Sequence, residues 1–290
     1  MNLLRSTVIL LAVIFLPALS HAQKSYTFKV KYEPNTTYKT TMDNVGVVIM
    51  DIDADEEMKA QLAAAGQAFP MTMNMNQSMA SSLKTEASTE NNSLPVVLSY
   101  DDISIEQSMN GQPMPTAPEN PMLNAKIYAQ INENGAFKVD KVEGNNINSQ
   151  MKQTVSKTLD KMFDMVKFPE QKLKIGESFE VDVPFSLPVM GKPIDMDIKT
   201  VYTLKDVKNG IAIFSLTQEV EMTADLDGMS ISATGNGTGA LRFNTKSSFY
   251  EDYQTKLKMN MNMVVPNPGK TMRMNMNMDM DSNVQYQIVK

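Results

Sequence analysis

The sequence contains no cysteine, and its only histidine is His21. Without cysteine the protein forms no disulfide bond, has no thiolate nucleophile, and cannot carry a lipid anchor on a cysteine behind a leader segment. His21 lies in a segment that we expect to be removed, so histidine chemistry is excluded from the mature chain as well. Hydrolysis would then need a Ser–Lys pair or two carboxylates, and no Ser-x-x-Lys motif stands in a strand-to-helix context. We therefore expect that the protein is not an enzyme.

Long apolar runs are also absent, apart from one at the N-terminus. There Arg5 supplies a positive charge, residues 8–19 form the apolar run, and Ser20 and Ala22 are small residues at the −3 and −1 positions of a cleavage site. The run is too short to span a bilayer comfortably, so it predicts a signal peptide over residues 1–22 rather than a membrane anchor. We expect a soluble exported protein, periplasmic or secreted, without a transmembrane segment.

The charge balance excludes further classes of partner. The chain carries a net charge of −6, and removal of residues 1–22, which contain one basic and no acidic side chain, makes it −7. A mildly acidic chain without a basic block is not expected to bind nucleic acid or to dock electrostatically on anionic lipid. The sequence gives no indication of the oligomeric state.

Apolar and polar residues alternate through most of the mature chain, for example over residues 25–32. The alternating segments are separated by four turn-forming pairs: Asn110-Gly111, Asn134-Gly135, Asn209-Gly210 and Asp227-Gly228. Alternation is typical of half-buried strands, and these dipeptides accept the positive φ angles of tight hairpins. We predict a mainly β protein with a large curved antiparallel sheet or half-barrel. Residues 23–290 are expected to form a single domain, with a candidate sub-boundary near residues 168–174.

Two segments depart from the alternation. Residues 55–67 are rich in alanine, glutamate, lysine and leucine and begin with acidic residues. Residues 148–167 carry apolar side chains at helical spacing, namely Met151, Val155, Leu159, Met162, Phe163 and Val166. Both patterns predict amphipathic helices, which we expect to pack against the sheet.

Methionine is present in unusual number, with 26 in the chain. Twelve of these methionines form three runs, and within the runs nearly all are spaced two positions apart. The runs are Met71, Met73, Met75 and Met79; Met259, Met261 and Met263; and Met272, Met274, Met276, Met278 and Met280. Side chains at i and i+2 of a strand share a face, so each run predicts a row of thioethers with the intervening residues turned to water. The parity of the third run continues to Ile288, which predicts one unusually long strand.

The second and third runs are joined by residues 264–271, which contain two prolines and a glycine and predict a hairpin. We expect Met263 to lie opposite Met272. Directly opposed residues share a face, so the two rows would merge into one methionine surface.

Three interpretations of this surface stay open. Alternating apolar residues are most often the buried face of a sheet, which would suit a non-catalytic structural or interaction protein of the cell envelope. Methionine, however, is flexible and does not define one packing of a core well. Its thioether recurs on surfaces that accept varied apolar partners. The second interpretation is therefore a binding surface for a lipid, an acyl chain or an apolar peptide, with the twelve methionines as ligand-binding residues and the two helices as a lid.

The third interpretation is a soft-metal site, because thioethers favour Cu(I). No histidine or cysteine would assist the sulfurs, and rows of this length exceed what one ion needs. We assign no metal and no cofactor.

Part of the chain resembles a known group of proteins. The residues that carry the likeness are Phe168-Pro169, Leu173-Lys174-Ile175-Gly176-Glu177-Ser178-Phe179, Tyr202-Thr203-Leu204, Asn209-Gly210-Ile211-Ala212 and the alternating Gly235, Gly237 and Gly239. This succession of a turn, a hairpin and a glycine-alternating strand resembles a group of uncharacterised exported bacterial β-rich proteins, a domain of unknown function. Tryptophan is common there at the position of Phe179. The resemblance implies a β-rich fold and no particular activity or functional residues.

The expected architecture is similar to that of periplasmic lipoprotein carriers of the LolA and LolB type, which also lay helices against a long curved antiparallel sheet. The similarity concerns architecture alone, and architecture does not imply function.

Overall fold

The computed structural model describes residues 24–64, 66–89, 93–115, 120–123, 125–132, 135–144, 147–162, 168–189, 192–226, 228–267 and 270–290. The expected signal peptide, residues 1–22, lies outside these ranges, as do Asn134, Phe163, Val166 and Asp227. Within the ranges, no helix is long and apolar enough to cross a membrane.

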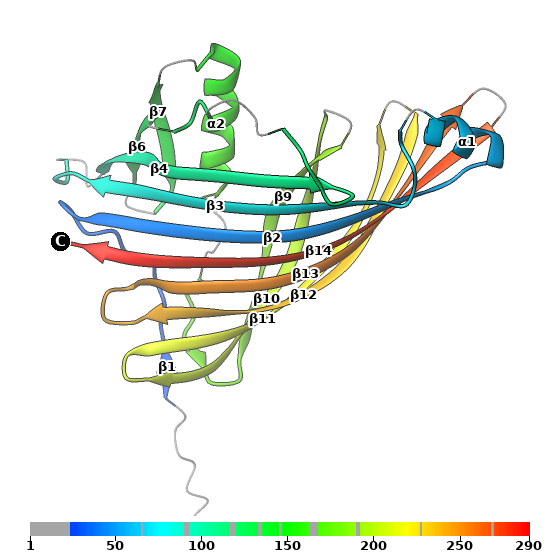
Figure 1. Cartoon of the computed structure of the whole chain (residues 1–290). Helices are drawn as coiled ribbons and strands as arrows, with labels where there is room; N and C mark the ends of the chain where they lie inside the picture. Colours follow the sequence, from blue (N-terminus) through cyan, green and yellow to red (C-terminus); the bar gives the residue numbers. More distant parts are fainter. Residues whose placement is uncertain are drawn as a thin grey trace, which may run out of the picture.

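One twelve-stranded sheet forms most of the molecule (Figure 1). Its strands are β2 (Thr37–Asp53), β3 (Met71–Thr85), β4 (Leu94–Met109), β5 (Gln112–Pro113), β6 (Lys126–Ile131), β7 (Phe137–Glu143), β9 (Ser178–Val189), β10 (Lys192–Lys208), β11 (Ile211–Leu226), β12 (Met229–Asn244), β13 (Phe249–Asn267) and β14 (Lys270–Val289). Their order in the sheet is β7-β6-β4-β3-β2-β14-β13-β12-β11-β10-β9, and β5 pairs with β4. The pairings are antiparallel, as the alternation predicts.

The sheet does not close on itself, because in the described part of the chain β7 and β9 each have one neighbour. Figure 1 shows the long strands bending along their length, so the sheet is strongly curved. The mainly β fold with a large curved antiparallel sheet is thus confirmed, and so is the long last strand, since β14 has 20 residues. Asn110-Gly111 and Asn209-Gly210 both have positive φ at each residue, as their hairpins require.

The glycines of β12 allow a close approach of its neighbour β13. A Cβ atom on Gly239 would lie 2.2 Å from the backbone oxygen of Gln254, and one on Gly235 would lie 2.6 Å from that of Lys258. No other residue type fits there without moving a backbone, so these glycines serve the packing of two strands.

The helix α2 (Ser149–Met162) packs on one end of the sheet, against β7. Its Leu159 is buried in a core with Tyr38 and Ile127, and Met151 and Val155 pack against the same core. The apolar face predicted for this helix therefore covers the sheet, and we call the face that it covers the inner face.

The helix α1 (Glu56–Ala64) differs from the expectation, because none of its residues is buried. It is shorter than the predicted helix and has few large apolar side chains. Asp55 precedes the helix as its N-cap, and its Oδ1 accepts a hydrogen bond of 2.8 Å from the backbone N–H of Met58. Figure 1 places α1 between β2 and β3 at the end of the sheet farther from α2, where it is a connection rather than a covering layer.

The alternating N-terminal segment forms far less strand than predicted. Only β1 (Ser25–Tyr26) is extended in a pair, with β8 (Leu173–Lys174). Farther along, Phe28 inserts among aromatic rings of the inner face, with ring centroids 5.1 Å from Phe214 and 5.8 Å from Phe243. Beyond β1, Phe28 thus finds its partners through side-chain burial and not through a strand pairing.

Candidate functional site

The second and third methionine runs lie side by side on β13 and β14. The opposed pairs are Met259 with Met278, Met261 with Met276 and Met263 with Met274. The expected pairing of Met263 with Met272 is wrong by two residues. Backbone pairing continues to Asn267 opposite Lys270, so the connection is shorter than predicted. A shift of two residues keeps every side chain on its face, so the rows still merge.

The first run joins the other two through β2, which lies between β14 and β3. Met276 is opposite Met50, and Met50 is opposite Met71. Val48 links Met278 to Met73 in the same way. The twelve predicted methionines and Met50 thus share the inner face across four adjacent strands, and we call these thirteen residues the methionine surface.

Sequence reasoning missed Met50 because apolar residues occupy both faces of this part of β2. Val45 and Ile49 point to the other face, where 53% and 41% of each residue is exposed. Where apolar residues do not alternate with polar ones, the sequence does not show which side chains of the strand face the core. The neighbouring Met42, opposite Met79, was missed for lack of a run around it.

The methionine surface is sealed at β13 and partly open elsewhere. Met259, Met261 and Met263 are 1–2% exposed. They pack among apolar residues of the neighbouring strands, including Ile198, Val220 and Ile231. The methionines of β14, β2 and β3 are only half-buried.

As far as the structure describes them, neither helix covers the methionine surface. The buried residues grouped with the methionines all come from strands, whereas Leu159 of α2 belongs to the core at the other end of the inner face. The expected lid over the methionines is therefore wrong for the described parts of both helices, since α1 buries none of its residues and α2 covers another region.

The difference in exposure predicts an order of oxidation. Mild hydrogen peroxide is expected to convert the methionines of β14 and β3 to sulfoxides at least about tenfold faster than Met259, Met261 and Met263, because oxidation follows access to the sulfur. Proteolysis and mass spectrometry after timed exposure would measure the rates. Equal rates in the native protein would contradict the burial described above.

The residues between the methionines face outward, as predicted. On the same outer face, next to the runs, Lys256 pairs with Asp281 at 2.7 Å and Lys258 with Asp279 at 3.2 Å. These exposed ion pairs contribute little to stability. They leave the polar and apolar faces of β13 and β14 cleanly separated.

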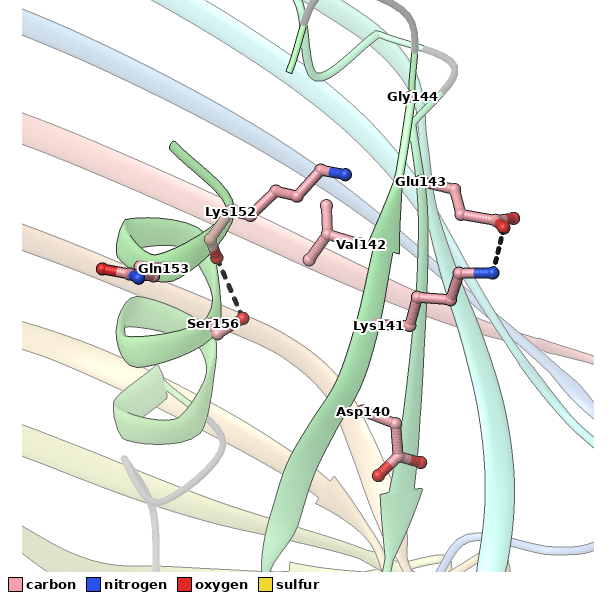
Figure 2. Close-up of a pocket in the computed structure, with 8 residues that line it drawn as sticks. All are labelled: Asp140, Lys141, Val142, Glu143, Gly144, Lys152, Gln153 and Ser156. Atoms are coloured by element: carbon pink, nitrogen blue, oxygen red, sulfur yellow. Dashed lines mark hydrogen bonds and ion pairs between the residues drawn. The ribbon is translucent and has the colours of Figure 1, made fainter. Parts of the chain in front are cut away.

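A hollow of about 750 Å³ lies away from the methionine surface, between α2 and β7 (Figure 2). Val142 points toward the helix, whereas Lys141 and Glu143 point away from it and form an ion pair. The hydrogen bond from Lys141 lowers the pKa of Glu143. The charges of Lys141 and Glu143 thus compensate each other. No group of three or more acidic, histidine or cysteine side chains that could hold a metal occurs in the described ranges.

Comparison with solved structures gives only distant likenesses. A structure of lipid–protein interactions in lipovitellin has 10% identity and a TM-score of 0.47, with 89% of this chain and 26% of that chain covered. The type II secretion system secretin GspD of E. coli K12 has 8% identity and a TM-score of 0.19, covering 88% and 49%. ExeD of Aeromonas hydrophila has 7% identity and a TM-score of 0.19, covering 88% and 48%. The chain thus spans between a quarter and a half of these proteins, and scores at this level support no functional argument.

Sequence comparison is more specific over part of the chain. No curated protein sequence matches. The segment whose turns and hairpin resemble a domain of unknown function lies inside a region matched by a family model, and the three methionine runs lie outside that region. Residues 125–250, from β6 to the start of β13, match the model of a family of unknown function (DUF6263).

Proposed function

We propose that this protein is exported and binds a hydrophobic ligand, a lipid or another molecule with an acyl chain, on the methionine surface. The observation that carries the proposal is a row of half-buried thioethers on the inner face of β14, β2 and β3, beyond the reach of α2. Half-buried apolar side chains grouped on one face of a soluble chain are typical of a binding surface.

The choice of residue supports the same function. Methionine is unbranched and polarizable, so a wall of thioethers adapts to chains of different length and unsaturation. The sealed methionines of β13 would form a rigid flank beside the half-buried ones. Each methylene group that an acyl chain buries there contributes about 0.8 kcal/mol.

A structural or interaction role in the cell envelope is the second candidate. The observation that favours it is the full burial of Met259, Met261 and Met263, which behave as ordinary core residues. In this role the remaining methionines would also be core, and no lipid would be found with the protein.

Lipid extraction decides between the two. The protein, expressed with its own leader and purified without detergent, is expected to release a lipid into organic solvent, detectable by mass spectrometry. The variant Met274→Gln/Met276→Gln is expected to carry several-fold less, because it removes thioethers from the half-buried row while keeping side-chain length. Asn275→Gln/Asn277→Gln changes the outer face of the same strand and is the matched control. Wild-type protein that carries no lipid, and that gains no thermal stability from added lipid, would contradict the proposal.

A further inference from the structure

A band of uncharged polar side chains crosses the inner face beside the methionine surface. Gln77 of β3 lies opposite Asn44 of β2, Asn44 opposite Ser282 of β14, and Ser282 opposite Thr255 of β13. Four adjacent strands therefore contribute one residue each, over about 15 Å at ~4.8 Å per strand. Two positions along β3 and β14 stand Met75 and Met280, so the band borders the methionine surface there, and Met79 lies on its other side.

These four side chains have unused hydrogen-bonding capacity. All are half-buried, and none makes a side-chain hydrogen bond with any described residue. A half-buried hydroxyl or amide beside an apolar surface gains free energy when a ligand brings it a polar partner. The band therefore offers donors and acceptors where the methionine surface offers none.

Gln218 of β11 adds a buried amide in the adjacent row of the inner face, opposite Gly237 and, beyond it, Leu257. It is only 8% exposed, and its Oε1 is buried without a hydrogen-bond partner in the part of the chain that the structure describes. That oxygen lies 2.6 Å from the position that a Cβ on Gly237 would take, so it points over the glycine toward β13. A buried carbonyl oxygen left in this state is unfavourable unless a donor reaches it.

The inner face around the band carries no charge. Over residues 37–53, 71–85, 255–263 and 272–289, every charged side chain stands on the outer parity of its strand. Three charged residues adjoin the band in sequence: Lys256 and Asp281, which pair with each other on the opposite face at 2.7 Å, and Asp43, which stands on that face as well. A carboxylate or phosphate brought to the band would be desolvated with no cation beside it, which is strongly unfavourable.

We infer that the methionine surface takes an uncharged amphiphile, such as a monoacylglycerol. Its acyl chain lies along the methionines, and its hydroxyl or ester head hydrogen-bonds to the polar band. This inference rests on the proposed function and adds the class of ligand. From Met280 to Met272 the row is about 26 Å long at ~3.3 Å per residue, which accommodates an extended long acyl chain.

The test compares two ligands with the same chain, monolaurin and laurate, at a pH where the carboxylate is ionised. Titration calorimetry on wild-type protein freed of lipid is expected to give at least about tenfold tighter binding of monolaurin, which is ~1.4 kcal/mol. Equal or tighter binding of laurate would overturn the inference and leave the hydrophobic site standing. Binding of neither ligand would overturn the proposed function as well.

A substitution that places a charge in the band tests whether the head group of the ligand binds there. Gln77→Lys is expected to raise laurate affinity at least about tenfold and so to remove most or all of the preference for monolaurin, because the ammonium would pair with the carboxylate. Asn76→Lys adds the same charge to the outer face of β3 and is expected to leave both affinities within twofold of wild type, a change of ~0.4 kcal/mol. Circular dichroism confirms that each variant is folded. An unchanged preference in Gln77→Lys, or an equal change in Asn76→Lys, would overturn the placement of the head on the band.

Discussion

Replacing Met261 by alanine is expected to lower the free energy of unfolding by about 2–5 kcal/mol, whereas Met276→Ala is expected to lower it by about 1 kcal/mol or less. The two methionines are directly opposed on neighbouring strands and share a face. Met261 is 2% exposed, so its truncation leaves a cavity among packed side chains. Met276 is half-buried, so water or a moving neighbour fills the space that its truncation leaves.

Urea unfolding of lipid-free protein, followed by circular dichroism, measures both losses against wild type. The pair is its own control, because residue type, parity and position along the ladder are matched. A large loss in both variants would mean that the whole methionine surface is core, which favours the structural role. A small loss in both would mean that the β13 row is open as well.

Raising the pH above about 10 is expected to destabilise the protein steeply, because several tyrosines, one of them fully buried and the others half-buried, must stay un-ionised in the folded state. Burial, followed by the nearby phenols of Tyr286 and Tyr38, raises the pKa of Tyr32. Burial also raises the pKa of Tyr250, Tyr286 and Tyr202. Tyr250 and Tyr286 lie with ring centroids 5.4 Å apart, so ionising one phenol opposes ionising the next.

The folded-state pKa of each of these tyrosines exceeds its unfolded value of about 10, so the unfolded chain releases the proton first. Their contribution to stability is therefore complete below pH ~10 and is lost as the pH rises toward the folded-state value. The loss is about 1.4 kcal/mol per pH unit for each such tyrosine. Urea midpoints at stepped alkaline pH, with tyrosinate absorbance as a second signal, measure it.

The variant Tyr286→Phe isolates one member of the cluster. Its unfolding free energy is expected to fall less steeply with alkaline pH, by about 1.4 kcal/mol per pH unit, because one titrating group is gone. The raised pKa values of these phenols would be contradicted if the full tyrosinate absorbance of the wild-type protein, corresponding to all nine tyrosines, developed with a midpoint near pH 10 while the protein is still folded.

The methionine rows were readable from the sequence, while their exact partners were not. Met272 to Met280 share a face because the side-chain period of an extended chain is two, whatever the neighbouring strand does. The pairing of Met263 with Met274 depends on how many residues the connecting turn consumes, which is a property of that turn and of both strands together.

The covering of the sheet was still harder to anticipate. Met151, Val155 and Leu159 correctly indicated that α2 has an apolar face, and that face is packed. Their spacing could not indicate which part of the inner face receives the helix. The polar band was missed for a related reason, since Asn44, Gln77 and their partners stand far apart in the chain.

Amino-acid order alone decides which side chains of one strand stand together, because that depends only on the geometry of neighbouring peptide units. It therefore settles that the thioethers of each run lie on one side and the asparagines and charges between them on the other. Only the folded chain decides which strands adjoin, how far the rows are sealed, and which residues far apart in the chain meet on one face. Those outcomes depend on long-range pairing and burial, in which many segments compete for the same partners.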